Sequence, residues 1–280
     1  MPKPQFLLFF VLAFMLLGCG GAGITAAGGT TGGNPAPMNG KSAAQTVAEG
    51  SLLFSKTRTG VGLITKKAAS ATLIEIARTA LVSPQSSGWV YNSSIGFYTR
   101  VTNITLNSFV VQFSTDGTTN DAGSVKVTRL YGGAGHYPEA ARLDFNLILG
   151  QTTITGPLTL VVNDSAWNDV QVQMNLASTQ PPIGVASNVH AVGNNVTGDL
   201  SVTRSGSTVI TLTNIAYSPS GFAADFATLG VQGDVTINAD GSGIVHSVDN
   251  AGTWTLTWDT NQNATCMAPD GTSAAISLQT

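Results

Sequence analysis

The stretch Val170-Gln-Val-Gln-Met-Asn-Leu176 decides the fold, because apolar and polar side chains alternate along it without a break. Successive side chains of a β-strand point to opposite faces of the sheet. This period of two therefore predicts a strand with one apolar and one polar face. Trp254-Thr-Leu-Thr-Trp258 repeats the pattern with larger apolar residues.

The same alternation continues on both sides of these stretches and predicts roughly a dozen strands in all. Further runs lie near residues 95–101, 107–113, 124–130, 143–149, 153–162, 199–204, 208–215 and 231–238. Asp-Gly pairs, which are strong hairpin signals, stand at 116–117, 240–241 and 270–271. No long helical pattern lies between the strands to serve as a crossover, so the pairing should be antiparallel. Residues 85–280 are predicted to form a mainly β domain, a long antiparallel meander that covers its apolar face as a sandwich or a half-open barrel.

Three segments within this domain share a pattern of an apolar residue, a polar residue, glycine, and then alternation. They are Ile154-Thr-Gly-Pro-Leu-Thr-Leu160, Val196-Thr-Gly-Asp-Leu-Ser-Val202 and Val231-Gln-Gly-Asp-Val-Thr-Ile237. Their unequal spacing argues against a solenoid or a propeller. It favours a local device, used repeatedly, that leads a turn into a strand.

Residues 41–84 are predicted to be helical, with one or two helices packed on the sheet. Ser42 and Gln45 have the spacing of a capping box. The stronger helical pattern covers residues 63–82, and its apolar stripe consists of Ala69, Leu73, Ile76, Ala77, Ala80 and Leu81. Pro84 ends this pattern.

Residues 1–18 read as a signal peptide. Lys3 supplies a positive charge, and the uncharged apolar run from Phe6 to Leu17 follows it. About 20 apolar residues are needed to span a bilayer, so this run is short for a permanent anchor. It ends in Leu16-Leu17-Gly18-Cys19 rather than in an Ala-x-Ala site.

These last four residues resemble the lipobox of bacterial lipoproteins. The resemblance implies a diacylglycerol on the Cys19 thiol, cleavage between Gly18 and Cys19, and acylation of the new amino group, for example by palmitate. More than one acyl chain gives stable anchoring. Gly20, where the family's inner-membrane signal has Asp, implies the outer membrane. The alternative is an ordinary signal peptide with a chance cysteine at its end.

Residues 19–40 carry almost no large side chains and no charges, which is typical of a flexible tether. If Cys19 is lipidated, Cys266 has no partner for an intrachain disulfide, and a buried inert thiol is expected. An intermolecular disulfide or a reactive nucleophile is the alternative.

The charge balance excludes a nucleic-acid partner. The net charge is −3 and only 10% of residues are charged, whereas nucleic-acid binding calls for a strongly basic face. The basic residues gather at 41–82 and the aspartates at 143–280. A basic helical segment that packs near an acidic sheet explains this, and contact of that segment with anionic head groups is the alternative.

No catalytic or cofactor motif is present, and no cofactor is predicted. A Gly-x-Ser-x-Gly elbow and phosphate-cradle spacings are missing. His136, in a Gly-rich turn with Tyr137 and Glu139, forms the one cluster that a hydrolase could use. His190 and His246 lie far apart in the sequence and are expected to be ordinary surface residues.

One turn resembles a calcium loop, with oxygen donors at alternate positions. Its weak candidate metal ligands are Asp259, Asn261, Asn263 and Asp270. Ala264 stands where such loops need glycine, and Asp and Asn are also common turn residues.

The sequence thus predicts a lipid-anchored envelope lipoprotein with a non-catalytic β-rich binding or structural domain. Its partners would be the membrane, through the N-terminal acyl chains, and a protein, glycan or apolar ligand. The alternative is a carrier or chaperone for a lipid or other apolar ligand. The order of tether, helix and meander loosely resembles lipoprotein-sorting factors, without any of their motifs. An envelope hydrolase is a third hypothesis.

Overall fold

The computed structural model describes residues 39–56, 88–92, 96–133, 136–166 and 168–278. The described residues fall into two compact units, one of residues 88–193 and one of residues 39–56 together with 194–278. The predicted signal peptide, Cys19, most of the tether and the predicted helix at 63–82 lie outside the described residues.

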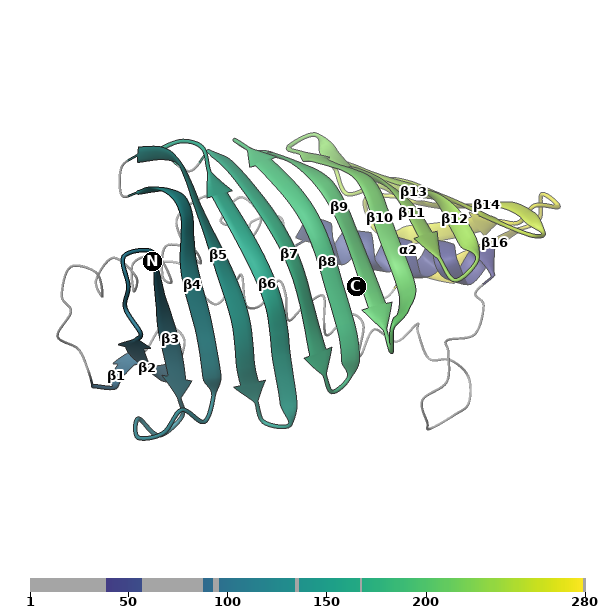
Figure 1. The fold of residues 1–280 in the computed structure, drawn as a ribbon. Coiled ribbons are helices and arrows are strands. Elements are labelled where there is room, and N and C mark those ends of the chain that lie inside the picture. Colours follow the sequence, from purple (N-terminus) through teal and green to yellow (C-terminus); the bar gives the residue numbers. More distant parts are fainter. Residues whose placement is uncertain (1–38, 57–87, 93–95, 134–135, 167, 279–280) are drawn as a thin grey trace. The chain divides into compact units, whose positions relative to one another are not determined.

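Within each unit the strand order follows the chain, from β1 to β8 in the first and from β9 to β16 in the second (Figure 1). The first unit contains β1 (Val90–Asn92), β2 (Phe97–Thr102), β3 (Ser108–Ser114), β4 (Gly123–Gly133), β5 (His136–Leu149), β6 (Thr152–Val162), β7 (Asp169–Thr179) and β8 (Pro182–Val192). The second contains α2 (Gly40–Lys56), β9 (Asn195–Arg204), β10 (Ser207–Ser218), β11 (Gly221–Thr228), β12 (Val231–Asn238), β13 (Gly243–Asp249), β14 (Gly252–Trp258), β15 (Asn263–Met267) and β16 (Ser273–Ser277). Within each unit neighbouring strands pair antiparallel. The predicted fold class, an antiparallel meander with a helix packed on it, is confirmed.

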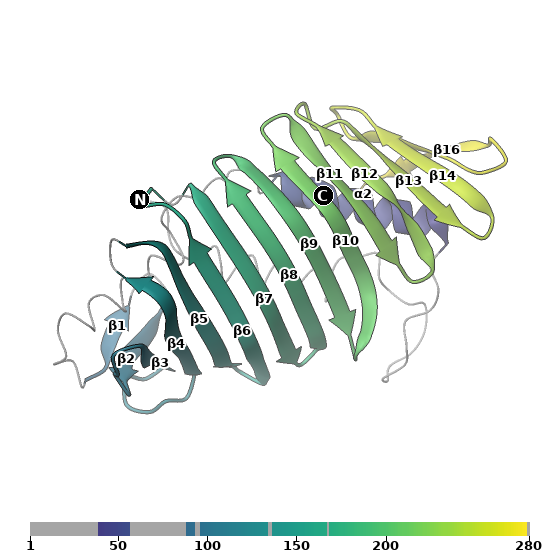
Figure 2. The same ribbon diagram turned by 45° about the horizontal axis from the view of Figure 1, so that its top comes forward.

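The predicted alternation appears directly in the burial of β7. Met174 and Leu176 are buried, whereas Gln173 and Asn175 between and beside them are exposed. We call the side of the buried residues the inner face and the opposite side the outer face. Burial of one such aliphatic side chain stabilises the folded state by about 1.5–3 kcal/mol, so the inner face determines the register. Figure 2 shows β5 to β8 lying side by side as neighbouring strands.

The structure has more strands than the sequence predicts, because six strands lack a strong pattern of their own. These are β1, β8, β11, β13, β15 and β16. Alanine, which is depleted in strands, occupies three of the eight positions of β11, yet β11 pairs with β12 along its whole length. Pairing with strongly patterned neighbours overrides a weak local propensity in these segments.

Helix α2 begins at a different cap from the predicted one. The Asn39 side chain accepts the backbone N–H of Ser42 at 2.9 Å, which makes Asn39 the N-cap. The predicted capping box of Ser42 and Gln45 is therefore wrong. The Gln45 amide instead donates to Glu49 Oε1 at 3.0 Å and to the backbone oxygen of Ser277 at 3.2 Å. Contact with a distant strand replaces the local contact that the spacing suggested.

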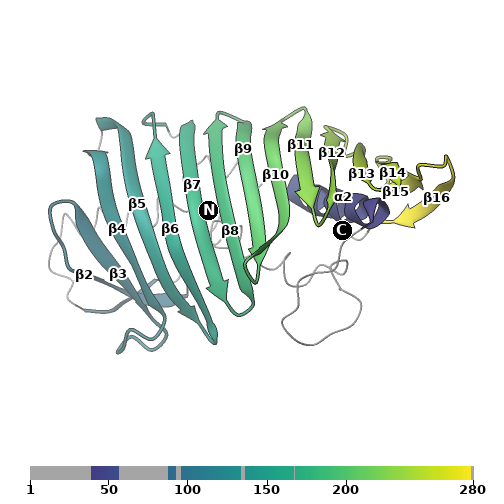
Figure 3. The same cartoon turned by 45° about the vertical axis from the view of Figure 1, so that its right-hand side comes forward.

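One face of α2 packs on the sheet of its own unit, against β12, β13 and β14 (Figure 3). Over residues 40–52, for which burial is described, the buried residues are Gly40, Ala43, Ala44, Val47, Ala48, Ser51 and Leu52. Most of these side chains are small, which lets the helix backbone approach the strands closely. No helix within the described ranges is long and apolar enough to span a bilayer.

The first residue of α2 is fastened to β13. The Gly40 N–H donates to Asp249 Oδ2 at 2.7 Å, and Ser247 Oγ donates to the Gly40 carbonyl at 2.6 Å. Trp254 Nε1 donates to the same carboxylate oxygen at 3.1 Å. The Gly40 N–H is the main reason that the pKa of Asp249 lies below its ordinary value. A carboxylate at a helix N-terminus also complements the helix dipole.

Replacing Gly50 by alanine is expected to stabilise the protein. Gly50 lies inside α2, and a Cβ at this position would meet no atom within 4 Å. Glycine in a helix interior costs about 0.5–1 kcal/mol relative to alanine, so we expect the free energy of unfolding to rise by about that amount. Chemical denaturation of the wild type and Gly50→Ala measures this change. A lower stability would show that α2 does not hold its helical conformation at Gly50.

The repeated segments found in the sequence lie in β6, β9 and β12, every third strand. Two of their glycines, Gly156 and Gly233, mark places where neighbouring backbones approach closely. A Cβ on Gly156 would overlap the carbonyl oxygen of Asn175, and a Cβ on Gly233 would overlap that of His246. Both glycines lie across from a phenylalanine of the preceding strand, as in the Gly233–Phe226 pair. At these two positions the repeat provides a close contact between strands that only a residue without a side chain fits.

Candidate functional site

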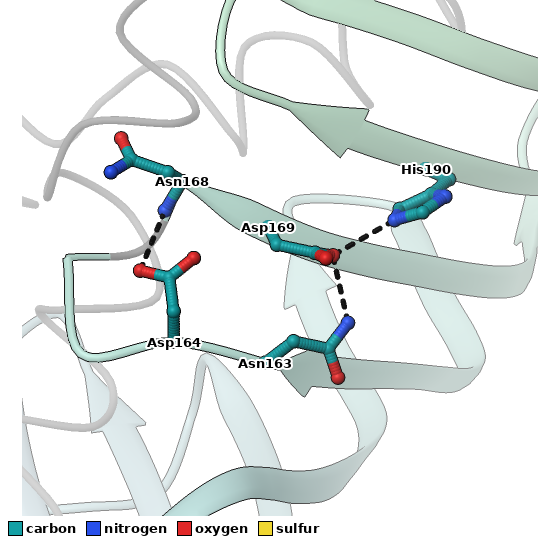
Figure 4. A network of polar contacts seen from close by, with 5 residues as sticks. All are labelled: Asn163, Asp164, Asn168, Asp169 and His190. Carbon is teal, nitrogen blue, oxygen red and sulfur yellow. Dashed lines mark hydrogen bonds and ion pairs between the residues drawn. The ribbon is translucent and has the colours of Figure 1, made fainter.

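A network of polar side chains lies on the outer face where β6, β7 and β8 meet (Figure 4). Asp169 opens β7, Asn163 directly follows β6, and His190 lies near the end of β8. The Asp169 Oδ1 atom accepts a hydrogen bond from Asn163 Nδ2 at 2.7 Å and lies 2.8 Å from His190 Nε2. One carboxylate oxygen therefore joins three elements.

The turn between β6 and β7 holds this carboxylate in place. Asp164 Oδ1 accepts the backbone N–H groups of Ala166 at 2.7 Å and Asn168 at 3.2 Å. The backbone N–H of Asn163 donates to the Asp169 carbonyl at 2.9 Å and closes the turn. Asp and Asn are favoured in turns because they make such local bonds.

The hydrogen bonds lower the pKa of Asp169 below its ordinary value. The Asn163 amide contributes most and His190 contributes next. The side chains of His190 and Asp169 are 42% and 35% exposed, so solvent screens their attraction and the pair stabilises little. The network positions its side chains more than it stabilises the fold.

Acid should remove the contribution of Asp169 to stability. A carboxylate with a lowered pKa stabilises the folded state above the pKa of the unfolded chain, about 3.9 for Asp. That contribution is lost as the pH falls from there through the lowered folded-state pKa. We expect Asp169→Asn to be less stable than the wild type at pH 7 and the difference to shrink below about pH 4. Urea denaturation at both pH values measures this, and a difference independent of pH would contradict it.

Exposed amide side chains lie beside this network on the outer face of β7 and β8. Gln171 pairs with His190 across the strands, Gln173 with Asn188, and Asn175 with Ala186. We call Gln171, Gln173, Asn175 and Asn188 the amide row. All four are exposed, and within the described part of the chain their side chains make no hydrogen bond. Each amide presents both a donor and an acceptor to solvent.

The second unit carries a histidine–aspartate pair of its own. His246 Nδ1 on β13 lies 3.0 Å from Asp234 Oδ2 on β12, with both side chains on the outer face. Asp225 stands directly opposite Asp234, and Asn214 Nδ2 donates to Asp225 Oδ2 at 2.6 Å. Like charges directly opposite one another are unfavourable in a sheet, and the Asn214 and His246 contacts offset this.

The histidine cluster predicted for a hydrolase lies at the start of β5. His136 pairs with Gly133 in the strand ladder and is exposed. In the described ranges no hydrogen bond or ion pair joins the side chains of His136, Tyr137 and Glu139.

The weak calcium candidates lie at opposite ends of β15: Asp259 and Asn261 in the turn before it, Asn263 as its first residue, and Asp270 in the turn after it. Asp259 Oδ1 accepts the backbone N–H groups of Asn261 and Asn263, both at 2.9 Å. Asp270 lies in the following turn, where it accepts the N–H of Thr272 at 2.9 Å. The structure thus brings Asp259, Asn261 and Asn263 together but not Asp270. Among all described residues, no group of three or more His, Cys, Asp or Glu is placed to hold a metal ion.

Cys266 lies on the inner face of β15 as a free, buried thiol, as expected from the sequence. Burial raises the pKa of this thiol, which keeps it protonated and weakly nucleophilic.

The sequence contains a signal for the contact between Asp234 and His246. Asp234 and His246 lie equally far from Asp240 in a hairpin whose Asp-Gly turn was predicted. Turn position and alternation together place the two residues opposite each other on one face.

No family model, no curated protein and no solved structure matches this chain.

Proposed function

We propose that the protein is a lipid-anchored envelope lipoprotein whose β-rich domain is a non-catalytic binding module. Its anchor would be Cys19, carrying acyl chains such as palmitate, in the outer membrane. Its binding surface would be the outer face of β6 to β8, and its partner an uncharged glycan of the envelope.

The amide row is the observation that carries this proposal. Exposed amides stand on adjacent paired strands, so the sheet fixes their spacing before any ligand binds. Pre-organised groups lose little conformational entropy on binding. Gln173 has Thr159 on one side and Asn188 on the other, so amides and a hydroxyl form a continuous polar strip. Such a strip offers alternating donors and acceptors, which suits a hydroxyl-rich polymer.

The burial of the inner face favours a binding module over a carrier for an apolar ligand. Leu176, Ile183 and Val185 are each 2% exposed or less. A carrier needs apolar side chains that line a space for its ligand, and these side chains are already covered by the protein itself.

Co-sedimentation of the full chain, in detergent, with isolated cell-wall glycan tests the proposal. We expect the triple variant Gln171→Ala/Gln173→Ala/Asn175→Ala to lose at least about tenfold in affinity, since each lost hydrogen bond contributes about 0.5–1.5 kcal/mol. The control is Thr253→Ala/Thr255→Ala/Thr257→Ala, which truncates alternate polar side chains of β14 in the same way. Equal binding by both variants would refute the amide row as the site.

Organic extraction and mass spectrometry of the same preparation test the alternative. A stoichiometric apolar molecule other than the acyl anchor and the detergent would favour the carrier function. If no such apolar molecule is extracted, the glycan proposal stands.

A further inference from the structure

Strand β16 ends the strand order and pairs with β15 along its whole length without a bulge. The Ala268 N–H donates to the Thr272 carbonyl at 2.8 Å, which fixes the phase of the hairpin ladder. Hydrogen-bonded and non-hydrogen-bonded pairs alternate in an antiparallel ladder. Ala274 and Ile276 therefore bond to β15, whereas the N–H and C=O groups of Ser273, Ala275 and Ser277 point away from it.

This outer edge carries no charge, proline or bulge. Natural edge strands carry charges, prolines or bulges that block pairing with another chain. β16 reads Ser-Ala-Ala-Ile-Ser, with no charge and no proline. Four of its residues are exposed and Ile276 is half-buried. The Ser277 carbonyl accepts the Gln45 amide at 3.2 Å, and it keeps a second lone pair.

We propose that β16 is an association edge at which two copies of this chain pair antiparallel about a two-fold axis at Ala275. In this arrangement the Ala275 residues of the two copies exchange their outward N–H and C=O groups. Ser273 of each copy faces Ser277 of the other, which adds equivalent pairs on both sides of the axis. The interface is isologous, as most dimer interfaces are.

The side chains favour a second copy of β16 as the occupant. About this axis the outer face brings Ala275 against Ala275, and the inner face brings Ala274 against Ile276. Both contacts join small or apolar side chains, so the inner and outer faces of one copy meet the same faces of the other. No charged side chains face each other across the interface. A slip of one residue would bring the inner face of one copy beside the outer face of the other, so such a slip is disfavoured.

Disulfide trapping in the full chain, in its native membrane, tests the pairing and its register. Hydrogen-bonded partners have Cα atoms about 5.5 Å apart, within the range that a disulfide spans. We expect Ala275→Cys to form a covalent dimer on mild oxidation. Ser273→Cys alone should not, whereas Ser273→Cys/Ser277→Cys should. The wild-type chain, whose native Cys266 is buried, measures the background level of disulfide-linked dimer.

The pattern of these products decides the proposal. A monomeric Ala275→Cys chain would overturn it, and so would Ser273→Cys linking as efficiently as Ala275→Cys. A disulfide to a different protein in place of the dimer would also overturn it, because another chain would then occupy the edge.

Proline at position 275 gives a second test that does not depend on cysteine chemistry. The Ala275 N–H points outward, so Ala275→Pro removes a donor of the edge and leaves the bonds between β15 and β16 in place. We expect this variant to sediment as a monomer in detergent and Ala275→Thr to remain a dimer. A dimer of unchanged stability in the proline variant would overturn the proposal. Glycan binding by the amide row should be the same in both, so the two proposals fail separately.

Discussion

Cys19→Ser is expected to lose all incorporated fatty acid, because the thiol is the atom that the lipobox resemblance assigns to diacylglycerol. A hydroxyl at the same position is a much weaker nucleophile at neutral pH than a thiol with its thiolate fraction. Metabolic labelling with a tagged palmitate, followed by gel analysis and intact mass, measures the loss. The wild type should carry the label and begin at Cys19.

The second cysteine of the chain provides the matched control. Cys266→Ser changes the same atom at a buried site, and this variant should keep its label. A wild type without label would contradict the lipoprotein proposal and favour the ordinary signal peptide. Equal labelling of Cys19→Ser and the wild type would show that acylation takes place elsewhere.

Gly233→Ala is expected to destabilise the second unit by about 3 kcal/mol. The added methyl group would overlap the carbonyl oxygen of His246 and press on the Phe226 ring. The carbonyl belongs to the backbone of β13, so it cannot turn away as a side chain would. Relief requires the pairing of β12 with β13 to shift, although this pairing also positions Asp234 opposite His246.

Urea denaturation of Gly233→Ala beside Gly50→Ala measures this effect with a built-in control. Both variants add one methyl group to a glycine, and the opposite signs expected for them separate local packing from a general effect of alanine. A change smaller than about 0.5 kcal/mol, the size usual for surface sites, would contradict the close approach at Gly233. A Cβ on Gly156 would likewise overlap a backbone carbonyl oxygen, that of Asn175, so Gly156→Ala should also destabilise the protein.

The candidate site could be predicted only in part. The alternation in β7 places Gln171, Gln173 and Asn175 together on the polar face, and the sequence shows this directly. Their neighbours on β8 depend on a register that the sequence does not display, since Pro182 and Gly184 weaken the pattern of that strand. The bond between Asp169 and His190 depends on the same register, so His190 reads as an ordinary surface residue until the strands are paired.

The sequence by itself determined the class of the fold, its turns and its two faces. Alternation and Asp-Gly turns are properties of neighbouring residues, and burial of the apolar face enforces them. It also supplied the proposed anchor, since a lipobox is read over a few adjacent residues. Only the tertiary structure decided which segments pair, that Asn39 rather than Ser42 caps α2, and that Asp249 holds the first residue of that helix. Most of these contacts join residues far apart in the chain, and their free energy depends on the packing within each unit, which no local pattern contains.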